Sequence, residues 1–491
     1  MASAATHTGE HSQTRDTRFF GHPLPLAQLF GLEMWERFSY YGMTGLLALY
    51  LYTAVDLGGV GLEEPTALAI VGAYGGAVFL ATVLGAWIAD RLMGAEPVLF
   101  WSAVIIMTGH IALALLPGLG GVAVGLILVA LGSGGLKANA SALVGSLYDE
   151  KDSRREAGFS IFYMGVNLGA LLGPLLTGIL QQRIGFHIAF GAAAAGMALG
   201  LVIYLTGRHK MPVEARHVPE PLPRKKMWVL PASIIGTVLA IFALWTSGLM
   251  NKENLATWTA LVSLGAAVIY FAVMLASKDV NSTERSRVVS FIPYFIASIA
   301  FWSLYQQIFN VMTSYSQNQL DRTLFGWEMP INWIQLIPPI FVIALAPVFS
   351  AIWLKMGDRQ PSAPVKAGLA LIIIGGAFLM FLVYANAEKN TVPLLWVTLI
   401  FMLFVIAELL ISPIGLSLST RLAPKAYTSQ MIAVFFLSSG VGTALSGVFS
   451  EYYDASNQAP YWSALGAGSI VVGIVVLAVA KPVVKLMKGV R

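Results

Sequence analysis

The sequence contains no cysteine and little charge, and both absences narrow what the chain can be. Only 11% of its 491 residues are Asp, Glu, Lys or Arg, against roughly 25% in a soluble domain. Without cysteine there is no disulfide, no thiolate nucleophile and no cysteine-bound metal. Hydrophobic residues make up 57% of the chain. The composition therefore predicts an all-α protein that crosses a membrane many times.

Signs of enzymatic chemistry and of nucleic-acid binding are also missing. The chain has no HExxH helix and no GxSxG turn, and its loops leave no room for a soluble domain. The net charge of +5 lies mostly in short loops, where it indicates membrane topology. We therefore expect no enzyme, no metal site and no nucleic-acid partner.

Apolar runs long enough to cross a bilayer can be placed fourteen times. The first two cover about 25–52 and 65–87. The third and fourth are separated at 117–121, and the fourth ends near Tyr148. The remaining ten cover about 157–181, 187–206, 228–248, 256–276, 289–314, 331–354, 365–384, 393–420, 427–449 and 461–487. The grouping is six plus two plus six. It predicts the major facilitator fold, in which two six-helix bundles are related by pseudo-symmetry, with an inserted helix pair.

The loops divide the chain into four predicted segments. A polar, disordered tail (1–22) precedes an N-terminal bundle (23–207). A basic linker with the inserted helix pair (208–285) then leads to a C-terminal bundle (286–491). Lys and Arg gather in alternate loops, and most densely in the linker. The positive-inside rule therefore puts both termini in the cytoplasm.

Three charged residues interrupt the first span within EMWERFSYYG, at 33–42. A charge at the bilayer centre costs roughly 2.5–3.5 kcal/mol on insertion scales, so Glu33, Glu36 and Arg37 must face protein or water. A static ion cluster that only fixes packing is the alternative, although it would be costly without a use. The same helical stripe also carries Tyr40, Tyr41 and Thr44.

Two further charges lie deep in the predicted spans. Lys137 follows a glycine-rich segment of the fourth span, and Glu408 is the only deep carboxylate of the second half. A wall of cations facing a carboxylate would form a bilobed binding site. Either charge could instead snorkel or bind water structurally. His110 and His187 are better explained as ordinary helix residues than as proton relays.

These segments resemble the signatures of the proton-coupled oligopeptide transporters, the POT or PTR2 family. EMWERFSYYG resembles the first-helix signature, and GSGGLKAN resembles the fourth-helix lysine segment. FSIFYMGVNLGALLGP (159–174), FWSLYQQ (301–307) and AELLISPIGLSL resemble the fifth-, seventh- and tenth-helix motifs. The resemblance spans nearly the whole chain, and the inserted helix pair is similar to that of bacterial members.

The resemblance implies symport of di- and tripeptides with protons into the cytoplasm by alternating access, without a cofactor. It implies proton coupling by Glu33, Glu36, Arg37 and Lys137, and a cytoplasmic gate formed by Lys137 and Glu408. The peptide-binding residues that it implies are Arg37, Tyr40, Tyr41, Tyr74, Lys137, Tyr163, Asn167, Trp302, Gln306, Glu408 and Ser439. We expect a monomer in the lipid bilayer of a bacterial inner membrane.

The sequence departs from the family pattern at the predicted outer gate. Gln306 stands where the family usually has an acid, and Thr44 stands where a basic residue is common. Both partners of the ion pair are thus missing, so we expect the outer gate to close by packing and neutral hydrogen bonds. Pro338 replaces an asparagine of many relatives, which removes one contact to a peptide amino group.

One rival is a transporter of the same fold for another solute, such as nitrate, another anion or an amphiphilic drug. A nitrate carrier should lack the intact glutamate-arginine signature, and a sugar carrier has no need of Lys137 facing Glu408. A membrane enzyme or receptor is the other rival, and the missing motifs leave it almost no chemistry.

Overall fold

The computed structural model describes residues 17–148, 152 and 154–490, and most of this part of the chain is helical. The predicted all-α architecture is confirmed. The first half contains α1 (Leu24–Tyr52), α2 (Glu64–Ile88), α3 (Ala95–Leu115), α4 (Gly118–Ser146), α5 (Arg155–Arg183) and α6 (Phe186–Gly207). Two middle helices follow, α7 (Val229–Thr246) and α8 (Leu255–Ala276).

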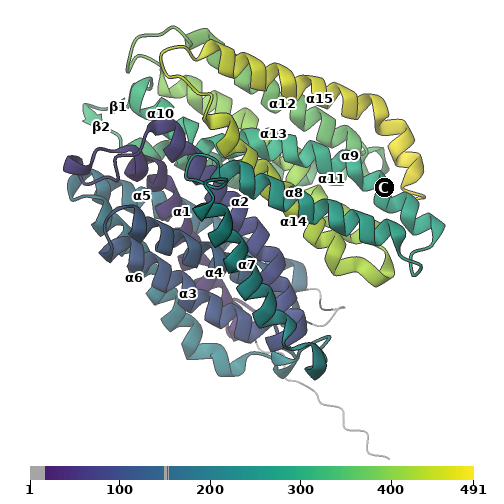
Figure 1. Cartoon of the computed structure of the whole chain (residues 1–491). Coiled ribbons are helices and arrows are strands. Elements are labelled where there is room, and N and C mark those ends of the chain that lie inside the picture. Colours follow the sequence, from purple (N-terminus) through teal and green to yellow (C-terminus); the bar gives the residue numbers. More distant parts are fainter. Residues whose placement is uncertain (1–16, 149–151, 153, 491) are drawn as a thin grey trace, which may run out of the picture.

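The second half contains α9 (Ser282–Tyr305), a short helix α10 (Val311–Asn318), α11 (Ile337–Met356), α12 (Ala363–Met380), α13 (Leu394–Leu422), α14 (Thr428–Ser450) and α15 (Ala459–Leu486). A two-stranded hairpin, β1 (Thr323–Leu324) with β2 (Trp327–Glu328), lies between α10 and α11. Figure 1 shows this hairpin at one end of the molecule, far from the C-terminus.

Twelve helical segments in the described part of the chain are long and apolar enough to cross a membrane. The helix α1 has 29 residues but carries three charges, and α7 is shorter. With these two, the number of spans reaches the fourteen that the sequence predicts. Loops rich in Lys and Arg alternate with loops that are poor in them, and we call the side of the rich loops the basic end.

The helices gather into two groups with α7 and α8 beside them (Figure 1). In the first group α1 packs on α5 and α6, and α4 packs on α2 and α3. In the second group α12 packs on α13 and α15, and α9 packs on α14. The groups meet where α2 lies along α14, and α8 contacts both of these helices. The predicted segment boundaries stay a prediction, and residues 1–16 of the predicted tail lie outside the described residues.

Glycines allow the two groups to approach closely at the α2–α14 contact. A Cβ atom on Gly72 would lie 2.4 Å from the Cα of Gly447, which is closer than real side chains allow. A Cβ on Gly85 would likewise lie 2.4 Å from the Cα of Gly135, where α2 meets α4. Small residues at these crossings let helix backbones touch, which is a common way to pack helices in membranes.

The seventh span is broken, whereas the sequence predicted a continuous span over 289–314. After α9 the chain forms a 3-10 turn (Gln306–Phe309), and α10 starts only at Val311. Asn310 has φ −120° and ψ −87°, and its side chain accepts a hydrogen bond of 2.8 Å from the Val311 N–H. Irregular backbone at membrane depth is tolerated where it lines a cavity, and this turn does so.

The start of the chain also differs from the prediction of a disordered tail up to residue 22. Phe19 and His22 exchange backbone hydrogen bonds in a tight turn, and Nδ1 of His22 lies 2.8 Å from the hydroxyl of Tyr148, just after α4. Arg154 donates to the carbonyl of Gly21 at 2.9 Å. Residues 17–22 are therefore attached to the basic end of the first group.

The linker after α6 is attached to the first group through a buried carboxylate. Glu96 is fully buried at the start of α3, and its oxygens accept hydrogen bonds of 2.6 Å from Nε of Arg208 and 3.1 Å from the Tyr204 hydroxyl. Nε of Arg216 lies 3.4 Å from the same carboxylate. Part of the positive charge of the linker is thus compensated by the first group of helices.

Candidate functional site

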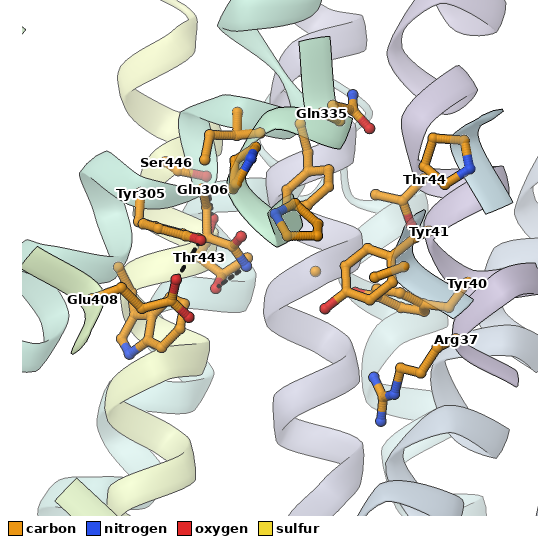
Figure 2. Close-up of a pocket in the computed structure, with 18 of the residues that line it drawn as sticks. Arg37, Tyr40, Tyr41, Thr44, Tyr305, Gln306, Gln335, Glu408, Thr443 and Ser446 are labelled. Carbon is orange, nitrogen blue, oxygen red and sulfur yellow. Dashed lines mark hydrogen bonds between the residues drawn. The ribbon is translucent and has the colours of Figure 1, made fainter. Parts of the chain in front are cut away.

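A cavity of about 180 Å³ lies between the two groups of helices. Its first-group wall comes from α1, α2, α4 and α5, and its second-group wall comes from α9, the 3-10 turn, α11, α13 and α14. Figure 2 shows Arg37, Tyr40 and Tyr41 on one side and Tyr305 and Glu408 on the other. The cavity is thus lined by residues from both halves of the chain.

A compact ion cluster stands at the first-group wall. Nε of Arg37 lies 2.8 Å from Oε1 of Glu33, one turn before it, and 3.1 Å from Oε2 of Glu36. Ser133 on α4 donates to Oε1 of Glu36 at 3.2 Å. Glu33, Glu36 and Arg37 are 3%, 0% and 7% exposed. Because Arg37 alone of the three lines the cavity, it is the member of the cluster that a ligand can reach.

Lys137 lines the same wall from α4, and it does not form an ion pair with any described carboxylate. Its Nζ lies 4.2 Å from the ring centroid of Phe79 on α2, a cation–π contact. A neutral aromatic ring compensates a charge only weakly, so the ammonium group keeps its capacity to bind an anion. The close α2–α4 packing at Gly85 and Gly135 places this lysine.

Aromatic rings connect the cluster to the second group. Tyr40 packs edge-on against Tyr41 and stacks on Tyr74, with centroids 5.3 and 6.2 Å apart. Tyr41 stacks on Phe309 of the 3-10 turn at 5.9 Å. Tyr74 is buried behind Tyr40 and does not line the cavity. The tyrosines therefore form a layered wall in which Tyr40 and Tyr41 face the cavity.

The second-group wall carries one carboxylate, with a neutral partner. Tyr305 donates to Oε2 of Glu408 at 2.6 Å (Figure 2). Beside this pair, Nε2 of Gln306 donates to the Thr443 hydroxyl at 3.1 Å. No ion pair with a described cation involves Glu408, so Lys137 and Glu408 both line the cavity without touching each other. The Glu408 carboxylate is therefore available to a cationic ligand group.

Neutral hydrogen bonds join the two groups at the end opposite the basic end. The Tyr52 hydroxyl donates to Gln317 at 2.6 Å. Nδ2 of Asn332 and Nε1 of Trp333 donate to the carbonyls of Pro174 and Leu175 on α5, at 3.1 and 3.2 Å. This is the kind of closure expected from the missing ion pair. Towards the basic end, α4 and α13, which carry Lys137 and Glu408, do not pack closely against each other.

Most of the residues that the sequence singled out do meet in this cavity. Those on its walls are Arg37, Tyr40, Tyr41, Lys137, Tyr163, Asn167, Trp302, Gln306 and Glu408. Ser439 does not line it, and its carbonyl instead accepts a hydrogen bond from Thr443. Sequence reasoning missed Tyr305, Thr443 and Phe79. One helical turn separates Ser439 from Thr443, so the spacing could have suggested Thr443 as a second candidate on the same helix face. No sequence signal indicated Phe79.

The described residues contain no group of three or more His, Cys, Asp or Glu side chains that could hold a metal ion. His110 is fully buried in α3 and does not line the cavity, and neither of its ring nitrogens has a hydrogen-bond partner among the described residues. What the cavity offers chemically is one guanidinium and one ammonium group facing a carboxylate, with hydroxyl and amide groups between them.

Comparison with known proteins gives a consistent picture. A model of the PTR2 family, described as the POT family, matches residues 97–480. A di-/tripeptide transporter of Lactococcus lactis subsp. cremoris is 39% identical over 487 residues, covering 96% of this chain and 98% of the relative.

Solved structures agree with that result. A mutant of the peptide transporter POT in complex with alafosfalin is 39% identical and superposes with a TM-score of 0.91, covering 97% of this chain and 98% of the other. A POT family transporter in complex with 5-aminolevulinic acid is 36% identical and has a TM-score of 0.90, with coverage of 95% and 98%. The similarity thus extends over whole chains in sequence and in structure.

Proposed function

This chain belongs to the POT family, and on that premise we propose that it imports di- and tripeptides together with protons by alternating access. The observation that carries the proposal is the cavity itself, in which Arg37 and Lys137 on one wall face Glu408 on the other. A transporter, and not an enzyme, is what the family and the fold support. The major facilitator fold predicted from the spans agrees with the matched structures.

The two walls suit the two ends of a peptide. A zwitterionic peptide carries its charges at a separation that changes little with its side chains, so fixed charges can bind the ends while the side chains vary. Arg37 and Lys137, with Tyr40 and Asn167, would bind the carboxylate. Glu408 would bind the amino group. A relative binds 5-aminolevulinic acid, which also has an amino group and a carboxylate.

The ion cluster on α1 supplies an account of proton coupling. While both carboxylates are ionised, Arg37 is held between Glu33 at 2.8 Å and Glu36 at 3.1 Å. Protonation of Glu33 would release the guanidinium for a peptide carboxylate across the cavity. Proton and peptide binding would then favour each other, because each lowers the cost of the other.

Alternating access follows from the two ends of the cavity. We place the basic end and both termini in the cytoplasm of a bacterial cell, because Lys and Arg favour cytoplasmic loops. With this orientation the hydrogen bonds from Asn332 and Trp333 to α5 would close the outer side, which supports an inward-facing state. An ion pair between Lys137 and Glu408, which is unformed in this state, would close the cytoplasmic side when the outer side opens.

The test is uptake of labelled dialanine into proteoliposomes with an inward proton gradient. We expect the native protein to accumulate the peptide, and the Glu33→Gln variant to lose accumulation while keeping peptide exchange in the absence of a gradient. Glutamine cannot take up and release the proton, but it leaves the peptide site in place. Glu63→Gln, on an exposed loop, is the matched control and should accumulate peptide like the native protein.

Two outcomes would contradict the proposal. Folded native protein without any dialanine uptake would mean that the cavity binds another solute, and anions and amphiphilic drugs would be tested next. Accumulation that survives in Glu33→Gln would remove this carboxylate from the coupling step.

A further inference from the structure

A second cavity, of about 1,040 Å³, lies in the C-terminal half and takes no part in the proposed transport. It lies between α11 on one side and α12 with α15 on the other, and α13 forms its floor. We call it the lateral cleft. It exists because α11 packs on α13 while α12 packs on α15, so that α11 stands apart from the α12–α15 pair.

Most of the cleft surface is apolar. Phe349, Trp353 and Leu354 of α11 face Leu409, Ile414 and Leu418 of α13 across it. Leu354 is 81% exposed, so its side chain is accessible to lipid or to a ligand in the cleft. A volume of this size exceeds that of the central cavity several-fold and can hold a hydrocarbon chain.

Four cations stand at one end of this apolar space, and no carboxylate does. The cleft is lined by Lys366, Arg421, Lys481 and Lys485, and by no Asp or Glu whose side chain the structure describes. None of the four forms an ion pair with a described carboxylate. The arrangement thus has a net positive charge that no described carboxylate of the cleft compensates.

Lys366 shows that this is more than a row of exposed cations at a membrane surface. It is only 7% exposed, its Nζ lies 4.0 Å from the ring centroid of Trp353, and it donates to Oε1 of Gln360 at 3.0 Å. An ammonium group has three N–H donors, so this buried cation retains donors for an anion in the cleft.

The depth of the four cations matches that of a lipid headgroup. Lys366 lies in the first turn of α12, Arg421 and Lys485 lie in the last turns of α13 and α15, and Lys481 lies one turn before Lys485. All of these helix ends are at the basic end. Basic pockets between transmembrane helices at this level are suited to anionic headgroups.

We propose that the lateral cleft binds one anionic phospholipid from the leaflet at the basic end. Its phosphate contacts Arg421, Lys481 and Lys485, with Lys366 below them, and its acyl chain lies between α11 and α13. Leu409 faces the cleft and follows Glu408, which faces the central cavity, so the bound lipid supports the helix that carries Glu408.

The charge part of the proposal is tested by titrating purified protein with phosphatidylglycerol and counting retained lipids by native mass spectrometry. Each cation near an anionic headgroup contributes about fivefold in affinity, so Arg421→Gln with Lys481→Gln and Lys485→Gln should weaken the tightest binding event about 100-fold. All three side chains are exposed, so the variant should fold. The matched control combines Lys355→Gln, Arg359→Gln and Lys425→Gln, which remove three exposed cations of the basic end outside the cleft, and should stay within about twofold of native.

The apolar part is tested without changing charge. Ser417 lines the cleft, so Ser417→Trp should place an indole ring in the space proposed for the acyl chain and weaken the tightest phosphatidylglycerol event. Leu416→Trp, at a 44% exposed neighbour outside the cleft, should have no such effect.

The proposal is overturned if the triple cleft variant binds phosphatidylglycerol like the native protein, or if both triple variants lose it equally. It is also overturned if phosphatidylcholine binds as tightly, because the cleft would then be a general hydrocarbon site. The readout is binding and not uptake, so its failure would leave the transport proposal untouched.

Discussion

The two walls of the central cavity differ in how their charges are compensated. On the first-group wall Arg37 contacts two carboxylates at 2.8 and 3.1 Å, and Lys137 rests on an aromatic ring. On the second-group wall the partner of Glu408 among the described residues is the neutral hydroxyl of Tyr305. The first wall can rearrange its own ion pairs when a proton arrives, whereas the described residues of the second wall contain no ion pair to exchange.

This difference separates coupling from recognition. A change of protonation at Glu33 or Glu36 alters what Arg37 binds, so the first wall can connect protons to the peptide. Glu408 can only exchange a hydrogen-bonded hydroxyl for a peptide amino group or for Lys137. The comparison therefore predicts that loss of Arg37, which serves both coupling and binding, affects every mode of transport. The effect of substitutions in the second wall should depend on the peptide offered.

Arg37→Ala should have the largest effect. Removing one partner of a buried ion cluster costs about 3–5 kcal/mol, because the remaining carboxylates stay buried and unpaired. It also removes the group that would bind the peptide carboxylate. We expect uptake and exchange of dialanine to fall at least about 100-fold, measured in proteoliposomes.

A matched control for this variant is Arg183→Ala, at the exposed end of α5. It should transport like the native protein. Retained exchange in a folded Arg37→Ala variant would break the comparison, because the first wall would then serve coupling alone.

Glu408→Gln should come next, with an effect that depends on the substrate. Loss of the charged partner of a bound amino group costs about 2 kcal/mol, or about 30-fold in affinity. Competition assays should show this loss for dialanine and a change of less than about threefold for N-acetyl-dialanine, whose amino end carries no charge. Equal losses for both peptides would exclude the role of Glu408 at the amino end.

Span positions could be read from the sequence because bilayer thickness fixes the length of an apolar helix. The span predicted at 157–181 is α5, Arg155–Arg183, and the span predicted at 393–420 is α13, Leu394–Leu422. The break at Asn310 could not be predicted in this way. Hydrophobicity continues through Ile308 and Phe309, and the turn depends on a side-chain cap and on Ser446, 136 residues away.

The same distinction, between features within one helix and contacts between helices, applies to the candidate site. Glu33, Glu36 and Arg37 were predictable as one cluster because they lie within a single helical turn, where spacing fixes geometry. Tyr305 with Glu408 and Phe79 with Lys137 connect different helices. Such pairs depend on how helices cross, and no local pattern encodes them. Ser439 was placed on the correct helix but one turn from Thr443, which lines the cavity.

Asn332→Ala should have a moderate effect, on the closed end and not on either wall. Losing its hydrogen bond to the Pro174 carbonyl costs about 1 kcal/mol, which raises the population open at that end about fivefold. Because the chain has no cysteine, Gln335→Cys introduces a single buried thiol near this contact. On intact cells, a membrane-impermeant maleimide should label this thiol about fivefold faster when Asn332→Ala is added to Gln335→Cys.

Asn318→Ala is the control for this measurement, because its side chain bonds only within α10, to Ser314. Its labelling rate should equal that of the parent. An unchanged rate in Asn332→Ala would show that Trp333 and packing hold the end closed without this bond.

An effect of similar size should distinguish Thr443, on the second-group wall, from Ser439, one helical turn before it in α14. Thr443 accepts a hydrogen bond from Gln306 at 3.1 Å and lines the cavity, whereas Ser439 lies behind it. Thr443→Val keeps the shape but loses the bond, which costs about 1 kcal/mol, or about fivefold in the affinity for dialanine by competition. Ser439→Ala should change this affinity less than about twofold. A larger loss of affinity in Ser439→Ala than in Thr443→Val would mean that the turn of α14 before Thr443 contacts the peptide. The amino group of the peptide would then lie closer to the basic end than the positions of Glu408 and Tyr305 indicate.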